Sequence, residues 1–184
     1  MRLIIGMSGA TGAIYGIRLL QVLQDYGVET HLILSPWAEA TIAVETSFTA
    51  EQVKKLASFT YASTNQAAVI SSGSFITDGM AVVPCSMKTL AAISHGFSDN
   101  LISRAADVVL KERRKLVVVP REAPLSEIHL ENMLRLARMG AVVLPPMPAF
   151  YTKPSTVDDI VNHTVSRILD QFGIDNHIAK RWLQ

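Results

Sequence analysis

Five short, β-branched apolar runs recur along the chain, and none of them alternates with polar residues. They are LIIG (3–6), THLILS (30–35), MAVVP (80–84), LVVVP (116–120) and AVVLP (141–145). Continuous apolar runs of this length are typical of strands that are buried on both faces of a sheet. The pattern therefore predicts a parallel sheet that is covered by helices on both sides.

Apolar side chains recur at helical spacing in most of the intervals between these runs, at residues 13–25, 99–114 and 127–139, and again after the last run, at residues 157–172. Gly27 follows the first of these segments, as expected at a helix C-terminus. Ser155 or Thr156 precedes the last one as a helix N-cap, with acidic residues in the first turn. The alternation predicts an α/β fold with a Rossmann-like (flavodoxin-type) doubly wound parallel sheet in three layers.

The segment between residues 50 and 78 is less regular. TAEQVKKLA (49–57) indicates a helix, whereas STNQAAVISSGSFITDG (63–79) is polar and typical of a loop. No internal repeat, low-complexity tract or linker interrupts the chain. Residues 1–184 are therefore expected to form a single domain.

Composition and charge indicate how the chain is buried and which kinds of binding partner and cellular location to expect. The chain of 184 residues is 49% hydrophobic and only 18% charged, which fits a sheet covered on both faces, extensive burial between subunits, or both. Its net charge of +1 gives no reason to expect nucleic acid or an anionic membrane as a partner. No apolar stretch reaches the roughly 20 residues of a membrane span, and no signal peptide is evident. The one cysteine favours a reducing, cytoplasmic location.

Candidate chemistry gathers where the predicted strands end, which is where doubly wound sheets bind ligands. The five strand ends are followed by SGAT (8–11), SPW (35–37), PCSMKT (84–89), PRE (120–122) and PPMPAFY (145–151). Their hydroxyls and backbone donors suit a phosphate, and their aromatic and methionine side chains suit a planar ring. We therefore expect this edge of the sheet to bind a ligand that carries both a phosphate and a planar ring.

The first of these strand ends is unusually rich in glycine. GMSGATGAIYG (6–16) carries Gly6, Gly9, Gly12 and Gly16 and leads into a predicted helix N-terminus, which favours an anion. It is not a Walker A loop, and Ser8 replaces the middle glycine of G-x-G-x-x-G. Phosphate binding is the favoured interpretation, and tight packing of strand against helix is the alternative.

Charged residues offer further candidates, each with a plainer alternative. Arg121 and Glu122 follow a buried strand, so Glu122 is either an acid/base or half of a surface ion pair. Arg104 and Lys111 share a helix face that suits either phosphate or solvent, and for the basic run 113–115 we favour solvent. Arg167 lies within the last predicted helix, between Val165 and Ile168, so we expect its side chain to be only partly exposed to solvent.

Cysteine and histidine offer little sign of chemistry. Cys85 has no histidine partner nearby and is expected to be a buried structural thiol. The histidines at 31, 95, 129, 163 and 177 lack metal-ligand spacing, so no metal is expected. Glu45 is either a surface acid or part of the site, since it follows the Ser35 strand end closely in sequence.

Taken together, these motifs resemble the flavin prenyltransferase family, the UbiX-like proteins once described as aromatic acid decarboxylase subunits. The resemblance spans the whole chain and rests on GMSGATGAIYG, LSPWA, VETSF, SSGSF, PCSMKTL, RAADVVLKERRKLVVVPREAPLSEIHLENM, MGAVVLPPMPAFY and RILDQFG. It implies a metal-independent transfer of a dimethylallyl group from dimethylallyl phosphate to N5 and C6 of reduced FMN. It also implies a homododecamer with sites between subunits, and a product used by UbiD-type decarboxylases.

The resemblance also assigns residues by position. The FMN contacts it implies are Gly9, Ala10, Thr11, Ser35, Ser86, Met87, Lys88, Thr89 and Arg121. The prenyl phosphate contacts it implies are Tyr151, Arg167, Arg104 and Lys111, with Trp182 covering the site. Glu122 resembles the acid/base near flavin N5, and Glu45 with the hydroxyl of Thr11 resembles the pair that handles the leaving phosphate and later proton steps. Position 11 departs from the family, where serine is common.

Two alternatives stay open. The first is an FMN-dependent decarboxylase of the phosphopantothenoylcysteine type. Those proteins tend to carry PASANT where this chain has PCSMKT, and they lack the PREAP run. The second is a non-catalytic FMN carrier subunit, which would explain the glycines but not the charged set of Glu122, Tyr151, Arg167, Arg104 and Lys111.

Overall fold

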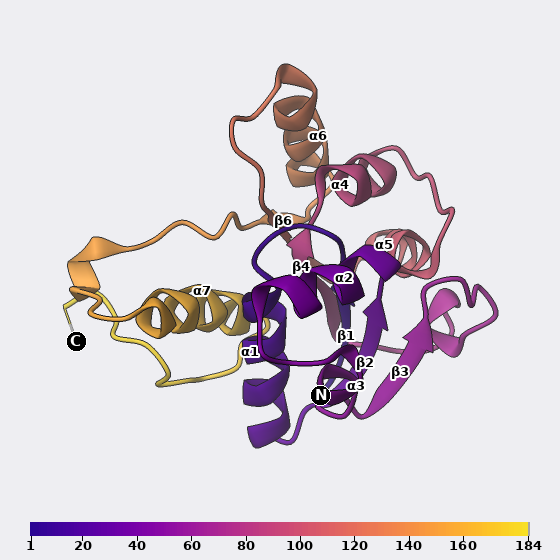
Figure 1. Cartoon of the computed structure of the whole chain (residues 1–184). Helices are drawn as coiled ribbons and strands as arrows, with labels where there is room; N and C mark the ends of the chain where they lie inside the picture. Colours follow the sequence, from indigo (N-terminus) through magenta and orange to yellow (C-terminus); the bar gives the residue numbers. More distant parts are fainter. Residues whose placement is uncertain (184) are drawn as a thin grey trace.

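The computed structural model describes residues 1–183 and contains one sheet of six parallel strands (Figure 1). The strands are β1 (Arg2–Met7), β2 (Glu29–Leu34), β3 (Phe59–Ala62), β4 (Gly79–Cys85), β5 (Lys115–Pro120) and β6 (Val142–Val143). Their order, β3-β2-β1-β4-β5-β6, is that of the Rossmann fold. The order reverses between β1 and β4, which places the topological switch point there.

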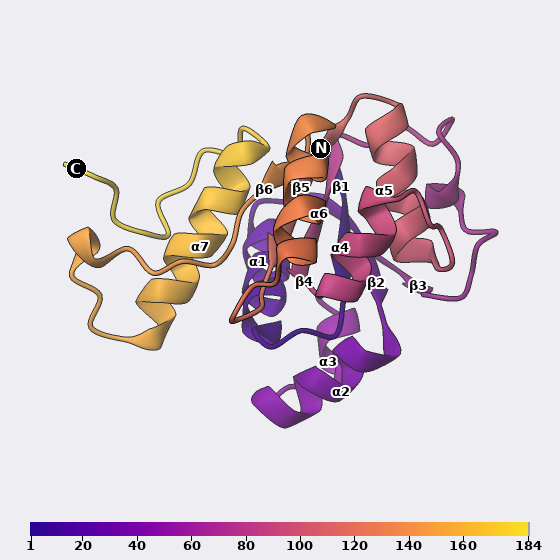
Figure 2. The same cartoon turned by 90° about the horizontal axis from the view of Figure 1, so that it is seen from above.

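Helices cover both faces of the sheet (Figure 2). One face carries α1 (Ala13–Asp25), α2 (Pro36–Glu45), α3 (Ala50–Lys54) and α7 (Val157–Gln171). The other carries α4 (Met87–Ser94), α5 (Leu101–Lys111), α6 (Glu127–Arg138) and the short 3₁₀ helix η1 (Val69–Ser71). The predicted three-layer α/β architecture is confirmed.

The strand side chains explain why the apolar runs are continuous. Along β1, Leu3, Ile5 and Met7 belong to the core on the α1 and α7 side, whereas Ile4 belongs to the core on the α5 side. All four are at most 1% exposed. Successive side chains of a strand point to opposite faces, so burial on both faces requires apolar residues at every position.

Besides short 3₁₀ helices, the structure adds one strand and two helices to the elements that the sequence pattern indicated. Strand β3 forms in the irregular segment and is mostly exposed, so it lacks the buried apolar run of the other strands. Helices α2 and α4 begin directly at the strand ends, with Ser35 and Ser86 as N-caps. Strand β4 continues through Pro84 to Cys85, one residue beyond the predicted end, with an irregular register against β5.

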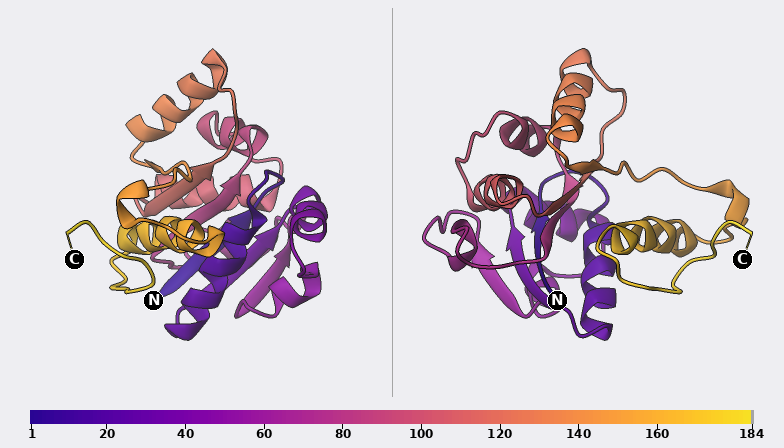
Figure 3. Two further views of the ribbon diagram at one scale, coloured as in Figure 1. Left: turned by 60° about the vertical axis from the view of Figure 1, so that its left-hand side comes forward. Right: turned by 180° about the vertical axis from the view of Figure 1, so that it is seen from behind.

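Two parts of the chain extend away from the sheet (Figures 1 and 3). One is α6, which exposes Ile128, Leu130 and Leu134. The other is the extended segment after β6, with the 3₁₀ helix η2 (Phe150–Thr152). Together with α7, which itself packs on the sheet, and the C-terminal tail, it is here called the arm (residues 144–183). Within residues 1–183 no helix has the length and apolar character needed to cross a membrane.

Candidate functional site

The carboxyl ends of β1 and β4 are joined by a buried serine at the switch point. Ser8 is 2% exposed; its hydroxyl donates to the Pro84 carbonyl at 3.1 Å and accepts from the Ser86 amide at 2.7 Å. The Ser8 amide donates to the same carbonyl at 3.2 Å. We call these contacts the Ser8 clasp. They fix the relative position of the glycine-rich turn and the Ser86 segment, both predicted to contact FMN.

The N-terminus of α1 is capped by a residue from another helix. Its N-cap is Gly12, which has φ of 99° and no side chain to cap with. Instead, Glu45 at the end of α2 accepts from the amides of Gly12 at 2.8 Å and Ala13 at 3.1 Å. A carboxylate is thus placed where the sequence favoured an anion. Glu45 therefore satisfies two of the free amides at this helix N-terminus.

Two of the glycines in the opening turn face protein atoms. A Cβ at Gly9 would lie 2.2 Å from Cβ of Trp37, and one at Gly16 would lie 2.5 Å from the Val83 carbonyl oxygen. Both separations are too short for any other residue. The packing interpretation therefore holds for these two glycines, whether or not a ligand also lies against the turn.

Hydroxyls at the ends of β2 and β4 are fixed as helix caps. Ser35 accepts from the Ala38 amide at 3.0 Å, and Ser86 accepts from the Thr89 amide at 3.3 Å while donating to the Thr89 hydroxyl at 3.1 Å. With α1, three helix N-termini face the same edge of the sheet. Their combined dipoles make this edge favourable for an anionic group.

The PRE segment leaves β5 at the same edge and is open to solvent. The Arg121 amide donates to the Cys85 carbonyl at 3.2 Å, which ties the segment to the end of β4. Beyond it, residues 121–128 are all exposed, and Glu122 accepts only from the neighbouring Ala123 amide, at 3.0 Å. Burial raises the pKa of Tyr15 on α1, and the positive charge of Arg121 opposes that shift.

The arm gathers another group of predicted residues. The Tyr151 hydroxyl lies 3.0 Å from Nε2 of His163, and its ring packs edge-on against Trp182 with centroids 5.1 Å apart. Arg167, one turn beyond His163 on α7, pairs with Asp170 at 2.7 Å. Tyr151 therefore lies against His163 of α7 and Trp182 of the C-terminal tail, and Arg167 follows His163 one turn along the same helix.

Asp170 also fixes the C-terminal tail. It accepts two hydrogen bonds from Arg181, at 2.8 and 3.1 Å, and one from the fully buried Asn176 at 3.2 Å. The guanidinium of Arg181, with a smaller contribution from Arg167, holds the pKa of Asp170 below its usual range. One carboxylate therefore links Arg167 to the segment that carries Trp182.

Arg104 and Lys111 lie on α5, which covers the opposite face of the sheet from α7 (Figure 2). Arg104 donates to the Ser71 carbonyl at 3.1 Å and to Asp107 at 2.9 Å, and Lys111 pairs with Glu112. Arg114 was expected to face solvent, and for this residue the expectation is wrong. It is half-buried and donates to the carbonyls of Gly73 and Phe75, because the polar 71–75 loop needs partners for its backbone.

The predicted site residues thus fall into three groups within one chain. The sheet edge holds Gly9, Ala10, Thr11, Ser35, Glu45, Ser86, Met87, Lys88, Thr89, Arg121 and Glu122. The arm holds Tyr151, Arg167 and Trp182, and α5 holds Arg104 and Lys111. No hydrogen bond or ion pair among residues 1–183 joins one group to another. The exposed donors at the sheet edge, which include Thr11, Lys88 and Arg121, fit a phosphate-bearing ligand such as FMN.

Histidine, cysteine and acidic residues form no cluster of three that could hold a metal ion in residues 1–183. Cys85 is completely buried, and burial raises the pKa of its thiol, which fits the expected structural role.

Sequence reasoning missed two residues that support the predicted ligands. His163 contacts Tyr151, and Asp170 pairs with Arg167. Their spacing from Arg167, four residues before and three residues after, places them on the same face of a helix. That spacing was a usable signal, but it does not reveal which side chains meet Tyr151 or Arg181.

Comparison with known proteins identifies the family. Residues 1–169 match the Flavoprotein family model. Two relatives are each called a probable UbiX-like flavin prenyltransferase. The one from Bacillus subtilis (strain 168) is 60% identical over 99% of this chain and 89% of its own length, and the one from Escherichia coli is 62% identical over 99% and 93%.

Solved structures agree. A dodecameric FMN-dependent UbiX-like decarboxylase from Escherichia coli O157:H7 superposes with a TM-score of 0.98 at 62% identity over the whole of both chains. AnUbiX, solved with FMN and dimethylallyl pyrophosphate, gives 0.98 at 55% identity over 100% of this chain and 97% of its own. The peptidyl-cysteine decarboxylase EpiD shares only the fold, with a TM-score of 0.65 at 18% identity. The chain belongs to the Flavoprotein family and, within it, to the UbiX-like flavin prenyltransferases.

Proposed function

We propose that this protein transfers the dimethylallyl group of dimethylallyl phosphate to N5 and C6 of reduced FMN and so makes prenylated FMN. The observation that carries the proposal is the full-length similarity to AnUbiX, which binds FMN and dimethylallyl pyrophosphate in one structure. When bound, reduced FMN supplies the nucleophilic N5 and C6 positions. The protein must therefore hold the flavin, bind the prenyl phosphate and manage the protons.

The sheet edge is the proposed flavin site. Gly9, Ala10, Thr11, Ser35, Arg121 and the segment from Ser86 to Thr89 would hold FMN there. The N-termini of α2 and α4 and the Arg121 guanidinium supply positive potential for its phosphate. The Ser8 clasp keeps this edge fixed before the ligand arrives, so little ordering is needed when it binds.

The prenyl phosphate is assigned to Tyr151, Arg167, Arg104 and Lys111, with Trp182 over the site. Breaking an allylic C–O bond without a divalent cation requires several cationic and hydroxyl donors on the leaving phosphate. Within one chain these donors lie on opposite faces of the sheet, on α7 with the arm and on α5. A site assembled from neighbouring subunits would unite them.

Such an assembly also accounts for the exposed apolar residues. The arm and α6 present Ile128, Leu130, Leu134 and Phe150 to solvent in the isolated chain. Exposed apolar surface of this kind is typical of an interface. We infer a homododecamer, the state of the Escherichia coli O157:H7 structure.

Glu122 and Glu45 are the proposed proton carriers. Glu122 is exposed at the end of β5 and pairs with no cation among residues 1–183, so its carboxylate is available to act as acid or base near flavin N5. Glu45 accepts from the amide of Gly12, the residue that follows Thr11 in the turn. We assign these two, with the Thr11 hydroxyl, to the leaving phosphate and the later proton steps.

We further infer that residues 1–184 act as one domain in the cytoplasm, and that the product is delivered to a UbiD-type decarboxylase. A decarboxylase of the phosphopantothenoylcysteine type and a non-catalytic FMN carrier remain the alternatives. The low identity to EpiD gives the first no support beyond a shared fold. The second leaves Glu122 and the cationic set without a purpose.

Anaerobic incubation of the protein with reduced FMN and dimethylallyl phosphate, followed by mass spectrometry of the flavin, tests the proposal. We expect a flavin heavier by one C₅H₈ unit. An unmodified flavin recovered from folded protein with bound FMN would contradict the proposed transferase activity. Decarboxylation of a cysteine-containing substrate in the same preparation would favour the first alternative.

A further inference from the structure

The hydrogen bond between Tyr151 and His163 joins a predicted substrate ligand to a residue with no assigned role. We propose that His163 is a positioning residue that holds the Tyr151 hydroxyl in the orientation needed to donate to the prenyl phosphate. This inference rests on the proposed function, because it needs Tyr151 to bind that phosphate.

Tyr151 depends on few contacts for its position. It lies in the three-residue helix η2 at the end of an extended segment and is 47% exposed. Its ring meets His163 edge-on, with centroids 5.8 Å apart and planes at 81°, and meets Trp182 in the same manner on another side. The hydroxyl has one side-chain partner, Nε2 of His163 at 3.0 Å. Loss of that partner leaves only ring contacts, which do not fix where the hydroxyl proton points.

The direction of the hydrogen bond follows from the number of protons. A phenol has one proton and also accepts hydrogen bonds. If Tyr151 gives that proton to the phosphate, it cannot also give one to His163, so Nε2 must carry a proton and donate to the tyrosine oxygen. With the proton on Nε2, His163 leaves the Tyr151 proton free for the substrate.

His163 is itself firmly held. It lies on α7 four residues before Arg167, so the proposed tyrosine and arginine ligands approach the phosphate from one helix face. Burial, followed by the nearby charge of Arg167, lowers the pKa of His163, while Asp170 on the same face opposes this. A neutral imidazole carries its proton on only one of its two nitrogens, so the position of that proton decides whether Nε2 donates or accepts.

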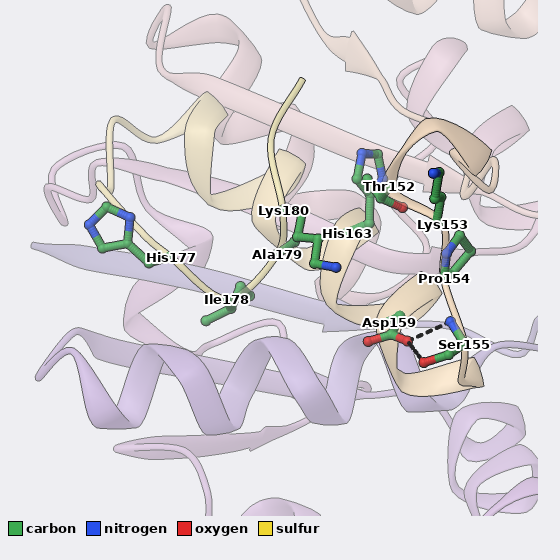
Figure 4. Close-up of a pocket in the computed structure, with 10 residues that line it drawn as sticks. All are labelled: Thr152, Lys153, Pro154, Ser155, Asp159, His163, His177, Ile178, Ala179 and Lys180. Atoms are coloured by element: carbon green, nitrogen blue, oxygen red, sulfur yellow. Dashed lines mark hydrogen bonds between the residues drawn. The ribbon is translucent and has the colours of Figure 1, made fainter. Parts of the chain in front are cut away.

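A cavity of about 250 Å³ lies beside His163, between the start of α7 and the C-terminal tail (Figure 4). His163 and the more exposed His177 both line it, and the tail residues Ile178 to Lys180 form its other wall. Because the imidazole borders open space, a slightly larger ring can replace it without displacing α7. This permits a substitution that keeps an aromatic ring and removes only the hydrogen bond.

Binding of dimethylallyl phosphate to the FMN-loaded protein tests the proposal, with the flavin oxidised so that no transfer follows. Isothermal titration calorimetry should show His163→Phe binding about tenfold more weakly than wild type, as for one hydrogen bond to a charged ligand. His163→Gln, whose amide nitrogen can donate from the position of Nε2, should recover most of the loss. His177→Phe, the matched change on the same cavity, should bind as wild type does.

A double-variant cycle separates positioning from a general structural role. If His163 acts through Tyr151, adding His163→Phe to Tyr151→Phe should weaken binding no further. In turnover, the single variant should raise KM for dimethylallyl phosphate about tenfold and leave FMN affinity unchanged. Equal losses in both backgrounds, unchanged binding by His163→Phe, or a parallel fall in FMN affinity would overturn the inference. A wild-type protein that binds dimethylallyl phosphate but never prenylates FMN would instead contradict the proposed function alone.

Discussion

The sheet edge and the arm hold their candidate residues in different ways. At the sheet edge, the contacts involve backbone groups: the Ser8 clasp joins β1 to the end of β4, and Glu45 binds two amides of α1. In the arm, side chains hold one another: Tyr151 contacts His163, and Asp170 pairs with Arg167 and Arg181. The first region is fixed by backbone contacts of the fold, whereas the second depends on a few partly exposed pairs of side chains.

This difference matches the two tasks of a transferase. A flavin bound at an edge fixed by backbone contacts has the same place in every turnover. The prenyl phosphate is assigned instead to side chains that hold one another, so a change to one of them can alter phosphate binding without disturbing the sheet. The comparison predicts that changes at the sheet edge affect folding or chemistry, and that changes in the arm affect phosphate binding.

Glu122→Gln should have the largest effect. The amide keeps the size of the carboxyl group but cannot exchange a proton, so prenylation should slow by about 10²–10³-fold while FMN binding stays unchanged. Single-turnover measurement of flavin prenylation, with FMN affinity measured separately, checks this. Glu131→Gln on α6 is the matched control and should be active. A fully active Glu122→Gln would remove the acid/base role.

Mixed oligomers test whether the arm works with α5 of another subunit. Arg104→Ala and Arg167→Ala should each lose about 10²-fold in prenylation, because each removes a cation from the leaving phosphate. Co-expressed and purified together, they should recover up to about a quarter of wild-type activity, since that share of sites receives both arginines when the two come from different chains. Activity can recover only if each site takes Arg104 from one subunit and Arg167 from another. Activity no higher than that of the single variants would place both arginines in the same chain's site.

Much of the fold could be predicted because burial leaves a direct trace in sequence. Four of the five apolar runs form buried strands, whereas the run at 141–145 forms only the two-residue, half-buried strand β6. The helices ending near Gly27, Gly140 and Gly173 form, and each of these glycines has a positive φ. Strand β3 could not be predicted, because it is an exposed edge strand that pairs with one neighbour only. Helices α2 and α4 were obscured by the prolines and serines that start them.

The site was harder to predict, because one residue type can serve several purposes. Gly9 and Gly16 were interpreted as room for a ligand, yet Trp37 and Val83 already occupy the space beside them. Glu45 could not be assigned to the α1 N-terminus from sequence, since the contact depends on how α2 packs beside the turn. Spacing identifies residues that share a face of one helix, but not which distant side chain they meet.

Ser8→Ala tests the sheet edge through stability. The change leaves the buried Ser86 amide without a partner, so it should lower the free energy of unfolding by about 2 kcal/mol. Ser74→Ala, which removes an exposed hydroxyl bonded to Ser72, is the control and should change it by about 0.5 kcal/mol or less. Chemical denaturation of both variants provides the measurement. Equal effects would mean that the clasp adds nothing beyond an ordinary surface contact.

Asp170→Asn tests the arm and should have the smallest effect on stability, about 1 kcal/mol, because its partners Arg167 and Arg181 are partly exposed. Since Arg181 holds the pKa of Asp170 below its usual value, the carboxylate stabilises the folded state above about pH 4 and loses that contribution as pH falls through the lower, folded-state pKa. Denaturation of wild type and variant should therefore differ at pH 7 and converge in acid. A difference that stays constant down to pH 3 would show that packing, and not charge, holds the tail against α7.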